Sequence, residues 1–79
     1  MIRVLDVKDD ERFRDKEYVD FNDFVNALSH TYYITDVGVT KDETVGYVYL
    51  EDKINYTNKT YIWFEDVNII NPRKYQKYL

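Results

Sequence analysis

Cysteine is absent from this chain, and histidine, proline and glycine are scarce, because its 79 residues include one histidine, one proline and two glycines. The lack of cysteine excludes disulfides and thiolate-ligated zinc, and the chain contains no glycine-rich loop that could cradle phosphate. The single imidazole, His30, could pair with Asp20 or Asp36, but no cysteine or convincing serine nucleophile accompanies it. Its more ordinary role is contact with the last carbonyls of a helix. The sequence therefore predicts no enzyme, no catalytic residue and no cofactor.

Long apolar runs are missing as well. No stretch approaches the roughly 18 residues that a membrane helix needs, and residues 1–6 lack the basic and apolar regions of a secretory signal. We therefore expect a cytoplasmic protein with no membrane partner. A chain of this length is expected to form one domain, here a compact α+β body over residues 1–70 followed by a short basic tail over 71–79.

Charge is distributed unevenly along the chain. Residues 71–79 carry three of the 11 basic side chains and no acidic one, which leaves residues 1–70 with eight basic and all 15 acidic groups, a net charge of −7. Such a body repels nucleic-acid phosphate and suits a basic surface on another protein. The same net negative charge is also explained by solubility alone. We expect a protein partner with a basic surface, and direct binding of nucleic acid is disfavoured.

One acidic run has the composition of a cation site. Residues 9–11 are Asp-Asp-Glu, and carboxylate oxygens ligate hard divalent cations. Nothing nearby in the sequence completes a cage, and Arg12 and Arg14 compete for these carboxylates. A charge run of this kind is typical of a solvated surface, so no metal site is predicted.

Hydrophobic periodicity predicts one helix and several strands. Phe21, Phe24, Val25 and Leu28 follow the i, i+3, i+4, i+7 spacing of an amphipathic helix over residues 20–29. Strand-like alternation or composition occurs at residues 2–7, 32–39, 45–51 and 60–64. Short polar connections between the last three favour antiparallel hairpins. The sequence predicts an α+β fold, with a small antiparallel sheet of three to four strands and the amphipathic helix packed on one face.

Aromatic residues are abundant, with nine tyrosines and one tryptophan. Strand side chains alternate between faces, and this sorts the two best strands in the same way. One face carries aliphatic residues and a phenylalanine, namely Val48, Leu50, Ile62 and Phe64. The other carries Tyr47, Tyr49, Tyr61 and Trp63. Since Tyr and Trp dominate interface hot spots, we predict that these last four residues bind a partner.

Other interpretations of the same residues stay open. A twisted sheet can bury both faces, with residues 2–7 or the basic tail covering the tyrosines. A homodimer could form through the same face. A low-GC genome also enriches tyrosine, isoleucine, lysine and asparagine without selection for binding.

Three functional hypotheses follow. The first is a small acidic protein-binding module, an inhibitor or modulator of bacteriophage type that covers a functional surface of a larger host protein in the host cytoplasm. The bacteriophage origin rests on an analogy of composition. The second is a DNA mimic, whose carboxylates occupy the nucleic-acid-binding surface of a DNA-binding protein. The third is a self-assembling structural protein.

Overall fold

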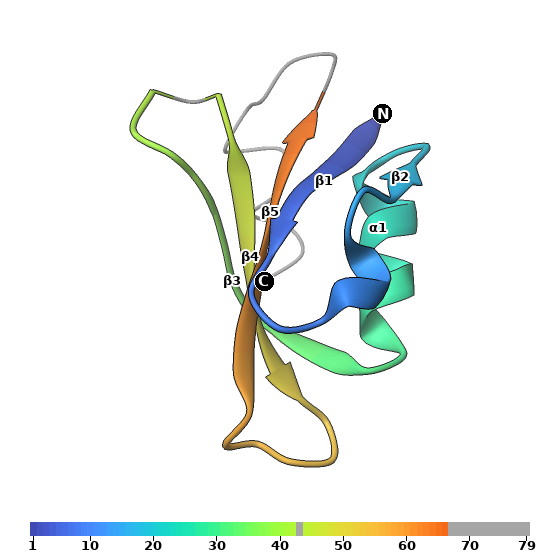
Figure 1. The fold of residues 1–79 in the computed structure, drawn as a ribbon, viewed down its shortest axis with the longest axis vertical. Helices are drawn as coiled ribbons and strands as arrows, with labels where there is room; N and C mark the ends of the chain where they lie inside the picture. Colours follow the sequence, from blue (N-terminus) through green and yellow to red (C-terminus); the bar gives the residue numbers. More distant parts are fainter. Residues whose placement is uncertain (43, 67–79) are drawn as a thin grey trace.

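The computed structural model describes residues 1–42 and 44–66 of the chain. Within them, five strands form one antiparallel sheet in the order β2-β1-β5-β4-β3, and a single α-helix lies on one side of it (Figure 1). In chain order the elements are β1 (Ile2–Val7), the 3-10 helix η1 (Glu11–Phe13), β2 (Glu17–Tyr18), α1 (Phe21–Ser29), β3 (Tyr32–Val39), β4 (Gly46–Asp52) and β5 (Lys59–Asp66). The predicted basic tail over 71–79 lies outside the described residues.

The predicted α+β class is confirmed, whereas the predicted number of strands is too low. The additional strand is β2, whose two residues pair with the start of β1 through Ile2↔Tyr18 and Arg3↔Glu17. Two residues cannot show the alternation by which a strand is recognised in sequence. The described residues contain no helix that is long and apolar enough to cross a membrane.

Helix α1 forms where the sequence predicts it, because its cap and its apolar stripe agree. The Asp20 carboxylate accepts a hydrogen bond from the backbone N–H of Asp23 at 2.9 Å, which satisfies one of the free donors at the helix start. Phe21, Phe24 and Leu28 are buried along one side of the helix. Burial of each such side chain contributes about 1.5–3 kcal/mol, more than the cap.

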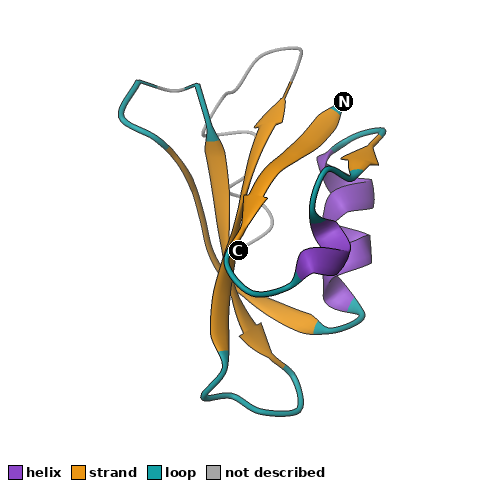
Figure 2. Cartoon of the chain, in the orientation of Figure 1, coloured by secondary structure: helices purple, strands orange, loops and turns teal. Residues whose placement is uncertain are grey.

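The core lies between α1 and one face of the sheet (Figure 2). The rings of Phe21, Phe24 and Phe64 meet there at centroid distances of 5.3 to 5.8 Å. Val48 and Ile62 are fully buried beside them. The aliphatic face that the alternation of β4 and β5 predicts is therefore the face that α1 covers.

Two β-bulges shape the sheet, one in β1 between Val4 and Asp6 and one in β3 between Ile34 and Asp36. In each, the aspartate carboxylate accepts a hydrogen bond from the next backbone N–H at 2.9 Å. Bulges bend a strand and increase its twist. Asp6 is paired with Trp63 and Asp36 with Tyr49, so both aspartates stand on the face opposite α1, where they border the aromatic residues described below.

Candidate functional site

The four predicted partner-binding residues meet on the sheet face that points away from α1. Tyr47 pairs with Trp63 across β4 and β5, and Tyr49 pairs with Tyr61. The ring centroids are 5.3 Å apart between Tyr47 and Tyr49, 5.9 Å between Tyr49 and Tyr61, 6.2 Å between Tyr61 and Trp63, and 6.4 Å between Tyr47 and Trp63. We call this closed group of four rings the aromatic platform.

The side chains of the platform are more exposed to solvent than those of the core. Tyr49 is 45% exposed and Trp63 37% exposed, while Tyr47 and Tyr61 are half-buried. Strand β1 does not lie over the rings, because it sits within the sheet beside β5. One of the covering segments that the sequence left open is thereby excluded. The other, the basic tail, falls outside the described residues, and the binding role of the four side chains stays a prediction.

A glycine under the platform determines how one of its rings lies. Gly38 in β3 pairs with Tyr47 in β4, and a Cβ atom at Gly38 would stand 2.3 Å from the Tyr47 hydroxyl oxygen and 2.5 Å from Cζ. The Tyr47 ring therefore lies across the bare backbone of β3. Glycine inside a strand often marks such a close approach.

Carboxylates surround the four rings. Across the strands, Asp36 is the partner of Tyr49 and Asp6 is the partner of Trp63. Glu51, one step along the same face of β4, is partnered by Lys59. Asp36 forms no ion pair within residues 1–42 and 44–66. Asp6 forms an ion pair with Arg14 at 3.0 Å, so the rim of the platform carries charges of both signs.

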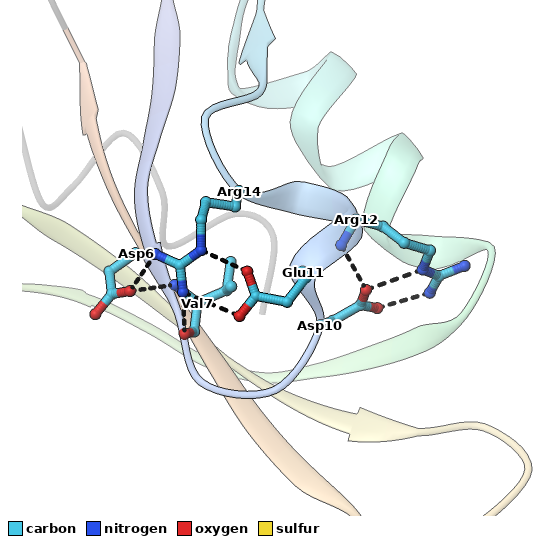
Figure 3. A network of polar contacts seen from close by, with 6 residues as sticks. All are labelled: Asp6, Val7, Asp10, Glu11, Arg12 and Arg14. Carbon is cyan, nitrogen blue, oxygen red and sulfur yellow. Dashed lines mark hydrogen bonds and ion pairs between the residues drawn. The ribbon is translucent and has the colours of Figure 1, made fainter.

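Two arginines form ion pairs and hydrogen bonds with the acidic side chains in and after β1 (Figure 3). Arg14 donates to the carboxylates of Asp6, at 3.0 Å, and Glu11, and it also donates to the carbonyl of Val7 at 3.4 Å. Arg12 donates through two nitrogens to the Asp10 carboxylate, at 2.9 and 2.6 Å. In the described part of the chain, no three His, Cys, Asp or Glu side chains are grouped so that they could hold a metal ion.

The Asp10 carboxylate also ties this segment to the sheet. The Tyr32 hydroxyl donates to it at 2.7 Å. The hydrogen bonds from Arg12 hold the pKa of Asp10 at about 2, against the opposing effect of partial burial. Burial, together with the bond to Asp10, raises the pKa of Tyr32 to about 12. One residue of β3 therefore fastens the loop that follows β1.

Replacing Tyr32 by phenylalanine is expected to lower the free energy of unfolding at pH 7 by about 1–2 kcal/mol, through loss of this hydrogen bond. The raised pKa of Tyr32 means that its contribution is complete below pH 10 and is lost as pH rises towards 12. The lowered pKa of Asp10 means that its contribution is complete above pH 3.8 and is lost as pH falls towards 2. Urea unfolding of both proteins from pH 2 to 11 should show a difference that narrows at both ends. A difference in unfolding free energy that stays constant with pH would contradict the assigned hydrogen bond between Tyr32 and Asp10.

His30 forms the C-cap of α1 with its backbone, and its N–H bonds to the carbonyl of Leu28. The helix-end contact expected of its imidazole is made instead by Lys53, whose ammonium donates to the carbonyl of Ser29. The Ser29 hydroxyl donates to the carbonyl of Val25 at 2.7 Å. Neither Asp20 nor Asp36 is hydrogen-bonded to His30 in the structure. The residues around His30 thus fix the end of the helix.

Sequence reasoning missed two exposed apolar side chains in the connection between β4 and β5. Ile54 is 95% exposed and Tyr56 is 65% exposed. The connection is held by side-chain caps, because the Asp52 carboxylate accepts from the N–H groups of Ile54 and Asn55, and the Asn55 side chain accepts from Thr57. The sequence signal that could have revealed their exposure is their isolated position among turn-forming Asp and Asn residues.

Comparison with known proteins gives no match: no family model fits this chain, and neither the curated proteins nor the solved structures include a significant similarity to it. The function must therefore be argued from the platform and its surroundings.

Proposed function

We propose that this protein is a small acidic binding module that docks through the aromatic platform onto a larger protein and covers a functional surface there. The observation that carries the proposal is the contiguous group of Tyr47, Tyr49, Tyr61 and Trp63 on the sheet face opposite a complete core. An exposed apolar patch with a polar rim is typical of a protein interaction site.

The contacts within the platform favour binding energetically. Each ring touches two neighbours, so its orientation is already restricted before a partner arrives. Binding therefore costs less side-chain entropy than it would for four independent rings. Tryptophan and tyrosine are also the side chains whose truncation most often costs 2 kcal/mol or more at an interface.

The charge around the platform favours a basic partner. Asp36 lies on the platform face and forms no ion pair within the described residues, whereas Asp6 and Glu51 lie beside Arg14 and Lys59. The described body as a whole carries more acidic than basic side chains. Complementary charge speeds encounter and disfavours acidic surfaces. Basic surfaces on intracellular proteins commonly bind nucleic acids, so covering such a surface would inhibit nucleic-acid binding by the partner. This is the action proposed here, as for a bacteriophage product that acts on a host protein.

The single tryptophan of the chain gives a direct test, because Trp63 stands within the platform. The protein labelled with 5-fluorotryptophan should give one 19F resonance. Addition of the partner, isolated from host lysate on the immobilised protein, should shift or broaden that resonance. A partner that binds at full stoichiometry and leaves the resonance unchanged would place the contact elsewhere.

The salt dependence of that binding separates the proposal from a DNA mimic. For contact dominated by buried rings, we expect the Kd to rise less than about fivefold between 0.1 and 0.5 M NaCl, because only the rim charges are screened. A DNA mimic places many carboxylates against a nucleic-acid site, and its affinity should fall by about 100-fold or more over the same range. Isothermal titration calorimetry at four salt concentrations measures the difference.

Self-assembly predicts a different observation. Sedimentation equilibrium of the protein alone, from micromolar to millimolar concentration, should give the monomer mass if the platform serves a different protein. A mass that rises with concentration, and that falls back when Trp63 is replaced, would assign the platform to contact between copies of this chain.

A further inference from the structure

Two similar β-bulges border the aromatic platform, one on each side. Asp6 in β1 pairs with Trp63, and Asp36 in β3 pairs with Tyr49. In both strands the residue after the aspartate is a valine, and its backbone N–H donates to the aspartate carboxylate at 2.9 Å. Each valine pairs in turn with a fully buried aliphatic residue of a central strand. The platform is therefore flanked by the same Asp-Val arrangement at β1 and at β3.

An arginine of the chain itself completes the β1 bulge (Figure 3). Arg14 donates through one guanidinium nitrogen to the Asp6 carboxylate at 3.0 Å, and through another to the carbonyl oxygen of Val7 at 3.4 Å. It also donates to Glu11. A planar guanidinium fork suits several acceptors that lie close together. The β1 bulge thus shows which group fits an aspartate carboxylate beside a valine carbonyl.

The β3 bulge offers the same acceptors. Asp36 is exposed and forms no ion pair within residues 1–42 and 44–66. The two backbone groups of a residue in an antiparallel ladder point to the same side, and the N–H of Val37 bonds to Asp36 rather than to β4. The Val37 carbonyl therefore also points away from β4, off the outer edge of β3, which is the last strand of the sheet. Neither the carboxylate nor this carbonyl meets a cation in the described part of the chain.

Two lysines in and beside the connection between β4 and β5 are engaged elsewhere. The Lys53 ammonium donates to the carbonyl of Ser29 at the end of α1. Lys59 is the cross-strand partner of Glu51. Neither lysine forms an ion pair with Asp36. The β3 side of the platform consequently carries an unpaired negative charge, whereas the β1 side carries an ion pair.

We propose that the β3 bulge receives an arginine side chain of the partner protein, in the way that the β1 bulge receives Arg14. This inference rests on the proposed function, because the bulge borders the platform. The guanidinium donates to Asp36 and to the Val37 carbonyl, and it lies beside the exposed Tyr49 ring, with which a cation–π contact forms. A lysine ammonium is a compact point charge without a planar fork for two acceptors. The partner is therefore a protein that presents an arginine on its docking surface.

The first test uses the capped peptide acetyl-Gly-Arg-Gly-amide, titrated into the 15N-labelled full chain at constant ionic strength and followed by heteronuclear NMR. Shifts that saturate in the millimolar range are expected at the amides of Asp36, Val37 and Tyr49. The amides of Asp6 and Val7 should not move, because Arg14 already occupies their bulge. The same peptide with citrulline, a neutral isostere of arginine, should cause no shifts, and the lysine peptide should bind severalfold more weakly. Equal binding of either analogue, or shifts that do not saturate, would overturn the proposal.

A substitution and a matched control locate the peptide. Asp36→Asn keeps an oxygen that accepts from Val37 but removes the charge, and it should weaken binding of the arginine peptide about tenfold. Asp15→Asn removes the same charge away from the platform, at a residue whose φ of 61° suits asparagine, and should leave the affinity unchanged. If both variants weaken binding equally, general charge attraction explains it and the β3 bulge is not the site.

Arg14→Gln tests the comparison between the two bulges. This variant empties the β1 bulge, so the arginine peptide should now shift the amides of Asp6 and Val7 as well. A folded variant in which these amides stay unmoved would show that the Asp-Val arrangement does not recognise a guanidinium, and the proposal would fall. If the variant does not fold, the titrations of the wild type and of Asp36→Asn decide the proposal.

The chain itself contains one competing arginine, Arg73 in the basic tail. Arg73→Gln should leave the affinity for the arginine peptide unchanged if the occupant of the bulge comes from another protein. An affinity that rises severalfold would assign the bulge to Arg73 and would overturn the role given to the partner.

The second test uses the isolated partner and separates this inference from the proposed function. Asp36→Asn should raise the Kd for the partner about tenfold, while the 19F resonance of labelled Trp63 still responds at saturation. If the resonance responds and Asp36→Asn binds as the wild type does, the platform stands as the docking face and the arginine inference is wrong. If the partner binds without any response of Trp63, the proposed function fails, and the arginine inference fails with it.

Discussion

Replacing Tyr49 and Trp63 together by threonine is expected to abolish partner binding and to leave the protein folded. Every ring contact of the platform involves one of these two residues, so the double variant removes its entire aromatic network. At about 2 kcal/mol per truncated hot-spot ring, the loss amounts to about 4 kcal/mol, or roughly 1,000-fold in Kd. Calorimetric titration with the isolated partner measures it.

The cost to folding should be much smaller than the cost to binding. Both side chains are among the exposed large hydrophobic residues of the described chain, and threonine keeps a high strand propensity. Loss of cross-strand ring contacts should lower the free energy of unfolding by about 1–2 kcal/mol. Thermal unfolding followed by circular dichroism measures this. A double variant that does not fold would show that the platform belongs to the core.

A matched control is available outside the platform. Tyr56 is more exposed than Tyr49, at 65% against 45%, and belongs to the connection between β4 and β5. Tyr56→Thr removes the same ring with the same replacement and should change the Kd less than about threefold. If this variant loses binding as fully as the double variant, the partner contacts the loop and the proposed docking face is wrong.

The elements with long, regular patterns were predictable from the sequence. The stripe of Phe21, Phe24 and Leu28 predicted α1, because a helix of this length shows its periodicity more than twice over. Alternation along β4 and β5 predicted which side chains share a face, since no bulge interrupts the register between these two strands. The spatial grouping of the four platform rings follows from that register.

What could not be predicted depends on pairing between distant segments. β2 forms only because its two residues pair with β1. The bulges at Asp6 and Asp36 shift the register by one residue, which no periodicity reveals. In each case the deciding information is tertiary.

The two glycines of the chain allow the same substitution to test both faces of the sheet. Gly46 in β4 pairs with Phe64 in β5, and a Cβ atom at Gly46 would stand 2.4 Å from Cζ of the Phe64 ring. Phe64 is fully buried and contacts Phe21 and Phe24. Gly46→Ala therefore overfills a closed core and is expected to cost about 1–3 kcal/mol. For a domain of this size, the Tm should fall by roughly 4–24 °C.

Gly38→Ala is expected to give the opposite pattern, because its added methyl group meets the Tyr47 ring on the open face. The half-buried ring can swing outward, and the lower backbone entropy of unfolded alanine offsets part of the cost, so the Tm should change by only a few degrees. The displaced ring no longer lies level with Tyr49 and Trp63, and binding should weaken about tenfold or more. Thermal unfolding and partner titration of both variants measure the two effects. If Gly38→Ala unfolds the protein as readily as Gly46→Ala, both faces of the sheet carry the fold; if it binds normally, the flat platform is not what the partner recognises.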